Sequence, residues 1–209
     1  MNFYKRSLHR ELLENKLMQY SALITGKVLD LGSKNRRYDS FFKNADSIIA
    51  IDIKPQSGKG VIPADILKLP FKERTFDAAI SFEVMEYIMD TENALAEISR
   101  ALKNKSVFIF SVPFLDPVHG DIDCVRFTIK GWEELLSKYF RINKVDAIGG
   151  RYSLIWDSYF EKVRNNYSRL LRMILFPILA SLKRLAISLD KKEKNTRFPM
   201  GYLFVCEKK

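Results

Sequence analysis

Cysteine is scarce in this 209-residue chain, and the two that occur, Cys124 and Cys206, fit no metal-ligand spacing. The sequence therefore predicts no disulfide framework and no metal site, and a reducing cytoplasm is the expected environment. Glycine is also sparse, with nine residues, and neither G-x-G-x-x-G nor a lysine-bearing phosphate loop occurs. These absences argue against NAD and ATP as ligands. The polar N-terminal segment has no apolar run, so no signal peptide is expected.

Long uncharged apolar runs are absent as well. The most apolar stretch, residues 170–189, is interrupted by Arg172, Pro177, Lys183 and Arg184. A spanning helix needs about 20 mostly uncharged residues. We therefore expect two amphipathic helices that meet at Pro177, followed by an exposed basic loop over 191–197.

Positive charge is abundant and unevenly placed. The chain carries a net charge of +10. Residues 151–209 hold 13 Lys/Arg and 5 Asp/Glu, a net of +8, which leaves +2 for the first 150 residues. A basic segment favours an anionic partner, such as a phosphorylated substrate, nucleic acid or a membrane surface, although a solvated basic face is an equal alternative. Because no RNA-binding motif is recognisable, nucleic acid is the least favoured of these partners.

Strand-like and helix-like segments alternate along the chain, which predicts a parallel sheet with helices on both faces. Ligands bind such sheets at the carboxyl ends of the strands. Those ends are expected at 30–34, 52, 81–83 and 113–119. We predict one domain (1–209), made of a core (25–149), a basic helical insertion (150–200) and a last strand (201–209). Strands are expected at 28–31, 47–53, 76–82, 106–112, 141–148 and 202–206, and helices at 4–20, from about 83, at 91–103 with Thr91 as N-cap, and at 130–139.

Four short motifs place acidic side chains at these strand ends. In VLDLGSKNRRY, Asp30 ends a strand and Gly32 permits a tight turn close to a ligand. In IIAIDIKP, Asp52 follows 22 residues after Asp30, where a carboxylate can accept hydrogen bonds from both hydroxyls of a ribose. In PADILKLPF, Asp65 can accept from an exocyclic amine, and FDAAISFEVMEYIMD places Glu83 after a strand. Each acid alone could instead be a cap or a turn residue.

Taken in order, residues 26–112 resemble the methyltransferase type 11 branch of the class I S-adenosylmethionine-dependent methyltransferases. The resemblance implies a Rossmann-like, doubly wound, mostly parallel seven-stranded sheet with an antiparallel last strand, and S-adenosyl-L-methionine as cofactor. Two positions depart from the family pattern: its second glycine falls at about Lys34, and its usual histidine is Tyr87 here. The cofactor-binding residues that the resemblance implies are Asp30, Gly32, Ser33, Asp52, Ile53, Asp65, Ile66, Ser81 and Glu83.

A later stretch, 111–140, resembles a subset of this family that often occurs with glycan-modifying genes. The resemblance makes His119 a candidate general base and Asp123 its catalytic partner, with Asp121 and Arg126 as candidate acceptor-binding residues. The alternative is that Asp123 and Arg126 pair to hold the loop and that His119 caps it.

The leading hypothesis is therefore a methyltransferase acting on a small-molecule or glycan-type acceptor, for example an anionic one methylated at a sugar hydroxyl. A non-catalytic binding module is the first alternative, because the turn after Gly32 is altered. A nucleic-acid methyltransferase is the second, because the chain is basic. The insertion has three interpretations: a lid over the acceptor, a segment (163–197) that lies on an anionic membrane at the inner face near a lipid-linked acceptor, or a dimer contact or helical cap.

Overall fold

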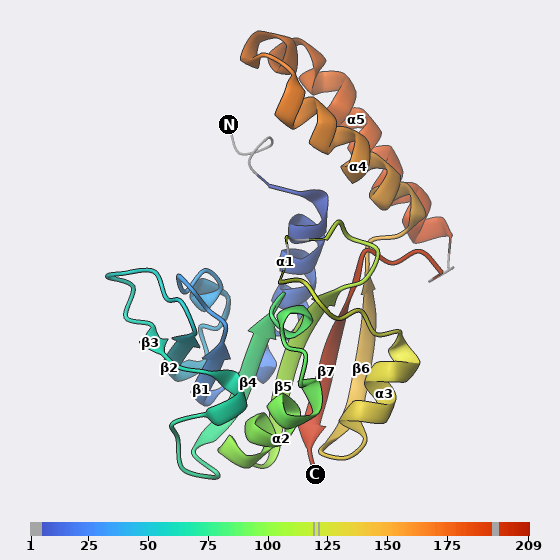
Figure 1. The fold of residues 1–209 in the computed structure, drawn as a ribbon. Helices are drawn as coiled ribbons and strands as arrows, with labels where there is room; N and C mark the ends of the chain where they lie inside the picture. Colours follow the sequence, from blue (N-terminus) through green and yellow to red (C-terminus); the bar gives the residue numbers. More distant parts are fainter. Residues whose placement is uncertain (1–5, 119, 121, 194–196) are drawn as a thin grey trace.

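The computed structural model describes residues 6–118, 120, 122–193 and 197–209 (Figure 1). Seven strands form one sheet in the order β3-β2-β1-β4-β5-β7-β6. The pairs from β3 to β5 are parallel, and β7 is antiparallel to both of its neighbours. The strands are β1 (Gly26–Leu31), β2 (Ala45–Asp52), β3 (Ile62–Pro63), β4 (Phe76–Phe82), β5 (Leu102–Pro113), β6 (Phe140–Ile148) and β7 (Gly201–Lys208).

This arrangement confirms the fold class expected from the sequence. The strand order reverses between β1 and β4, and that reversal is the switch point where open α/β sheets bind ligands. The five α-helices of the described residues are α1 (Leu8–Tyr20), α2 (Thr91–Ala101), α3 (Ile129–Leu136), α4 (Arg151–Asn166) and α5 (Arg169–Lys192). Short 3-10 turns occur at Ser21–Leu23, Asp39–Phe41, Ile66–Lys68 and Met85–Tyr87.

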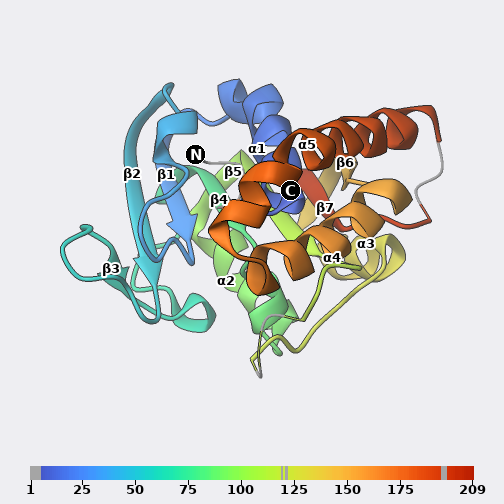
Figure 2. The same cartoon turned by 90° about the horizontal axis from the view of Figure 1, so that it is seen from above.

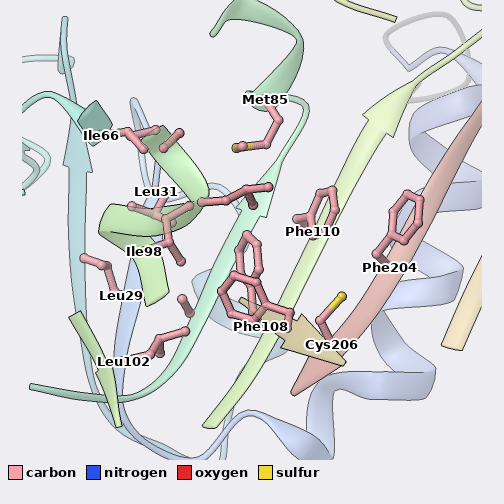
Figure 3. Close-up of a cluster of buried hydrophobic side chains, with 14 of the residues drawn as sticks. Leu29, Leu31, Ile66, Met85, Ile98, Leu102, Phe108, Phe110, Phe204 and Cys206 are labelled. Carbon is pink, nitrogen blue, oxygen red and sulfur yellow. The ribbon is translucent and has the colours of Figure 1, made fainter. Parts of the chain in front are cut away.

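Two apolar layers hold the sheet between helices. On one face, α2 and α3 pack against aromatic residues of β5 and β7, where Phe110 stacks on Phe204 at a centroid distance of 4.8 Å (Figure 3). On the other face, Leu13 and Leu17 of α1 cover Val28 and Ile80. Because the central strands are covered on both sides, they are continuous apolar runs and are easy to find in the sequence.

Local sequence interpretation was wrong at several places. The helix expected from Glu83 is only the 3-10 turn Met85–Tyr87, because Glu83 itself adopts a left-handed backbone (φ 57°). The cap of α2 is Asp90 rather than Thr91, since the Asp90 carboxylate accepts from Asn93 N at 3.2 Å. Pro177 lies inside α5 instead of between two helices.

The insertion forms a helical hairpin of α4 and α5, which turns at residues 167–168 (the α4–α5 hairpin, 151–192). The helix α5 also continues through Lys192, so part of the predicted basic loop is helical, while 194–196 lie outside the described residues. Figure 1 shows the hairpin standing away from the sheet, beyond the end toward which the arrows of β4 and β5 point. Within the part of the chain that the structure describes, no helix is long and apolar enough to cross a membrane.

Candidate active site

A cavity of about 260 Å³ opens at the carboxyl ends of β1 and β4, at the switch point of the sheet. The turn after β1 forms one wall, the segment after β4 forms a second, and the N-terminal part of α1 forms a third. Ligands bind α/β sheets at this position, so the cavity is the candidate site. It is lined by Ser7, His9, Arg10, Leu13, Gly32, Ser33, Lys34, Asn35, Arg37, Tyr38, Phe82, Glu83, Tyr87 and Asp116.

The turn after β1 requires glycine at position 32. Gly32 has φ +70°, and a Cβ added there would lie 2.4 Å from Cγ2 of Val84. Neither the backbone angle nor the space allows a side chain. Lys34 follows with φ 47°, so it adopts the left-handed backbone at the position where the family that the sequence resembles has a second glycine. The altered turn therefore keeps a glycine-like backbone shape.

Asp52 connects this turn to the end of β2. Its carboxylate accepts from Lys34 N at 3.0 Å and from Lys54 N at 2.7 Å. Each carboxylate oxygen has two lone pairs, so both can still accept from a ligand hydroxyl. Asp30 is buried beneath the turn, and this burial raises its pKa to about 7, although a hydrogen bond with Ser33 opposes the increase. Through its hydrogen bond with Ser33, Asp30 therefore helps to hold the turn in place.

Like Asp52, three further predicted cofactor residues lie outside the cavity lining, on the β2–β3 side of the carboxyl edge. Asp65 caps the 3-10 turn Ile66–Lys68, because its Oδ1 accepts from Leu67 N at 2.9 Å. Ile66 is buried against the core, whereas Ile53 is 69% exposed. The structure thus gathers Gly32, Ser33 and Glu83 in one cavity and places Asp52, Ile53 and Asp65 beside it.

Glu83 is held tightly at the end of β4. Its backbone N donates to Ser111 O at 3.1 Å, and its carboxylate accepts from Ser111 Oγ at 2.6 Å. A left-handed backbone at a non-glycine residue costs energy and often marks a functional site. The predicted neighbour Ser81 is fully buried, and its Oγ has no hydrogen-bond partner among the described residues.

A buried histidine joins Glu83 to a second carboxylate. His9 of α1 is 3% exposed, and its Nε2 lies 3.4 Å from the Glu83 carboxylate, while its Nδ1 lies 3.4 Å from that of Asp116. Burial by itself would lower the pKa of His9, but the two carboxylates outweigh it and raise that pKa to about 10. His9 is therefore a cation at neutral pH and cannot act as a general base there.

Asp116 lies between this cavity and a second one. The second cavity, of about 200 Å³, is walled by α4 and by the segment after β5, and it shares Ser7 and Asp116 with the first. It also contains Asp157 and Glu161 of α4. Asp157 accepts from Leu8 N at 3.0 Å and so holds the first turn of α1 in place. The first half of α4 thus forms one wall of the space beside the candidate site.

The structure describes only two of the four predicted acceptor residues. His119 and Asp121 lie outside the described residues. Asp123 and Arg126 form a bidentate ion pair, the geometry expected if they hold the loop, and neither lines the two cavities. The backbone N atoms of Cys124 and Val125 donate to Glu86 O, which fixes this loop to the segment after β4. Their role toward an acceptor stays a prediction.

Sequence reasoning missed His9 and Asp116. The helix α1 was expected from its apolar spacing alone, and nothing in that pattern places its histidine beside strand ends 70 to 110 residues away. Asp116 does fall in the stretch 113–119, which was expected at a strand end. Attention to every acid in that stretch would have found it.

Comparison with known proteins supports the resemblance carried by the motifs. Residues 29–110 match the family model described as a methyltransferase domain. The matched residues run from β1 to β5 of the sheet. The uncharacterized protein MJ1252 of Methanocaldococcus jannaschii is 31% identical over 116 residues, which cover 53% of this chain and 44% of that protein. The chain therefore spans less than half the length of this relative.

Solved structures share the fold of this chain. The [4+2]-cyclase SpnF superposes with a TM-score of 0.62 at 18% identity, covering 94% of this chain and 79% of that one. Phosphoethanolamine N-methyltransferase 2 of Haemonchus contortus, in complex with S-adenosyl-L-methionine, superposes with a TM-score of 0.60 at 16% identity, covering 96% and 52%. At these identities the likeness shows the fold alone.

Proposed function

We propose that this protein transfers a methyl group from S-adenosyl-L-methionine to a small-molecule acceptor. One observation carries the proposal: the glycine turn at Gly32, the Asp52 carboxylate and the Glu83 segment meet at the switch point of a methyltransferase fold. The sulfonium cofactor supplies an activated methyl group, so the protein mainly has to orient two reactants.

The residues present suit such a cofactor. Asp52 would hold the ribose hydroxyls, Gly32 lets the backbone approach the ligand, and Arg10, which lines the cavity, would pair with a carboxylate. Ile53, with its exposed side chain, and Asp65 would contact the base at the β2–β3 side. The left-handed Lys34 keeps the turn open where a glycine is usual in the family.

Asp116 is the best candidate for accepting a proton from the acceptor. It lies at the junction of the two cavities, where the acceptor would meet the methyl group. An oxygen nucleophile of high pKa must lose its proton, and a nearby carboxylate can take it. His9 fixes the carboxylate in position by its 3.4 Å ion pair and so acts as a positioning residue. His119 remains the alternative base predicted from the sequence.

The chemistry of the second cavity narrows the acceptor class. Asp116, Asp157 and Glu161 line it, so a hydroxyl or amine group suits it better than an anionic one. An anionic group on the acceptor would have to lie on the Arg10 and Arg37 side of the first cavity. A sugar hydroxyl of a glycan-type molecule remains our proposed acceptor, and we further propose that it is methylated in the cytoplasm, near the inner face of the membrane.

Calorimetric titration with S-adenosylhomocysteine tests the cofactor site. We expect micromolar binding in the unmodified protein and a loss of at least tenfold in affinity in Asp52→Ala. Asp46→Ala is the matched control, because it removes an exposed carboxylate at the opposite end of the same strand. Absence of binding in the unmodified protein would overturn the proposal.

A role without methyl transfer, either a different reaction or a non-catalytic one, is the second candidate, since the fold by itself does not fix the reaction. One structural neighbour is a [4+2]-cyclase. Binding of S-adenosylhomocysteine without methyl transfer to any hydroxyl or amine in a mass-spectrometric acceptor screen would favour this candidate over the methyltransferase.

A further inference from the structure

The helix α5 presents an apolar stripe to solvent. Leu170, Ile174, Ile178, Leu182 and Leu185 recur at intervals of three or four residues, so they share one helical face. Their exposed fractions run from 48% to 69%. At 1.5 Å per residue the stripe is about 22 Å long. Large exposed apolar stripes on soluble domains mark a surface that binds something.

The opposite face of α5 is already in use. Leu179, Ala186 and Ile187 pack against α1 and α4, in a cluster with Leu8, Trp156 and Phe160. The stripe is therefore not the face that holds the hairpin together. Among the described side chains from 161 to 185, none is buried, so the outer part of the α4–α5 hairpin has no core of its own.

The segment 162–189, which carries the stripe, has charge of one sign. From Lys162 to Leu189 the sequence contains six Lys/Arg and no Asp/Glu. One of the six, Lys183, forms an ion pair with Glu11 of α1. An apolar stripe within a purely basic segment complements a surface that is apolar inside and negative at its boundary, which describes an anionic lipid bilayer.

The position of the hairpin fits this partner. Figures 1 and 2 show it standing on the side of the sheet toward which β4 and β5 point, the side on which the candidate site opens. A hairpin docked on a bilayer would therefore bring the carboxyl edge of the sheet close to the lipid headgroups.

We propose that the α4–α5 hairpin docks the protein on an anionic membrane surface, with the stripe of α5 in the headgroup layer and the basic residues on lipid phosphates. The helix lies on the membrane and does not span it. The docking surface is independent of methyl transfer. Its consequence, that the acceptor is presented at the membrane, rests on the proposed function.

A second copy of the chain is the competing occupant of the stripe. Pairing two copies through the stripe would bring together two 162–189 segments that each carry six positive and no negative residues. Like charges at that distance repel, whereas an anionic surface attracts both the charges and the stripe. The charge pattern therefore favours lipid over self-association.

Vesicle flotation of the full chain tests the proposal. We expect binding to vesicles of phosphatidylglycerol and phosphatidylcholine, and at least tenfold weaker binding to phosphatidylcholine alone. The triple variant Leu170→Gln, Ile174→Gln, Ile178→Gln should lose at least tenfold in binding. Its matched control is Met18→Gln, Leu23→Gln, Ile62→Gln, which removes three exposed apolar side chains outside the hairpin and should bind normally.

Charge is tested with a second pair of variants. Lys162→Glu with Arg184→Glu should weaken binding to anionic vesicles, whereas Lys43→Glu with Lys59→Glu, at exposed sites outside the hairpin, should change it little. Circular dichroism confirms that each variant is folded, and titration with S-adenosylhomocysteine separates this proposal from that of the methyltransferase site. The proposal would be overturned if the unmodified protein failed to bind anionic vesicles. It would also be overturned if sedimentation showed a dimer that dissociates only in the triple variant of α5.

Discussion

His9 organises the candidate site at the scale of a single residue. It reaches from α1 to carboxylates that follow two different strands, Glu83 after β4 and Asp116 after β5. Three buried or partly buried charges at one point are costly unless they neutralise one another. The imidazolium therefore fixes the relative positions of two carboxylates that would otherwise repel.

Replacing this cation should destabilise the fold. We expect His9→Gln to lower the free energy of unfolding by about 3 kcal/mol, because the carboxylates lose their buried partner. The folded-state pKa of about 10 lies above the ordinary 6.5, so the stabilisation is complete below about pH 6.5 and disappears as the pH rises toward 10. Urea unfolding at pH 7 and pH 10 should show the difference from the unmodified protein shrinking.

The largely exposed ion pair of Arg141 with Glu207 supplies the control for His9. It joins β6 to β7. Arg141→Gln should cost less than about 1 kcal/mol, as exposed pairs do. Equal losses for the two variants would contradict a special role for His9.

Asp116 should matter for turnover and not for cofactor affinity. With an acceptor found by screening, we expect Asp116→Asn to lower kcat about 100-fold or more, as loss of a general base does. The dissociation constant of S-adenosylhomocysteine should change less than threefold, because Asp116 lies at the junction of the two cavities and is not among the residues proposed to hold the cofactor. If His119→Ala lowers kcat and Asp116→Asn does not, the base is the histidine predicted from sequence.

At the scale of elements, the turn at Gly32 makes the sharpest prediction. Gly32→Ala should cost about 1–2 kcal/mol for its positive φ alone, plus the overlap with Val84, and should abolish S-adenosylhomocysteine binding. Gly58→Ala is a matched control, because Gly58 has φ +73° and nothing within 4 Å of the added Cβ. Thermal melts compare the two variants.

A second-site change separates overlap from backbone strain at this turn. Adding Val84→Ala to Gly32→Ala removes the methyl groups that the new Cβ would meet. We expect partial recovery of stability. If Gly32→Ala is as mild as Gly58→Ala and still binds the ligand, the close approach of the turn has no functional role.

The sequence predicts the central strands well and the segments outside the central sheet poorly. The strand at 76–82 is a buried apolar run, and its predicted bounds are those of β4. The break at Pro177 was wrong because α5 is exposed around that residue, where water can satisfy the carbonyl that a proline leaves without a donor. The rule that proline ends a helix assumes that this carbonyl has no other hydrogen-bond partner.

The residues of the candidate site also divide into those that a local motif predicts and those that it does not. Residues that end or follow a strand within one motif, such as Gly32, Asp52 and Glu83, were found because each motif is local. His9 is brought to them only by the packing of α1 across the sheet. No local pattern encodes that contact, so its discovery required the three-dimensional structure.

Across the whole molecule, buried groups that bind protons in the folded state make the free energy of unfolding fall as the pH rises. Burial and the nearby Glu83 carboxylate raise the pKa of Glu86 to about 9, and burial raises that of Asp30 to about 7. An acid with a raised pKa binds more protons in the folded state, so stability falls as the pH rises from about 4.5 toward that pKa. His9 acts in the same direction above pH 6.5. The molecule should therefore lose stability steadily between pH 6 and pH 9.

Glu86 allows this pH dependence to be tested directly. Glu86 is 1% exposed, and its carboxylate oxygens have no hydrogen-bond partner among the described residues. Glu86→Gln keeps the shape but needs no proton, so we expect it to raise the free energy of unfolding at pH 8 by about 1–3 kcal/mol, with little gain at pH 4.5. Glu73→Gln, at an exposed site, should leave the urea-unfolding profile unchanged at both pH values. A destabilised Glu86→Gln at pH 8 would mean that the carboxylate is ionised and paired in the folded protein, and the alkaline loss of stability would then have to come from His9 and Asp30 alone.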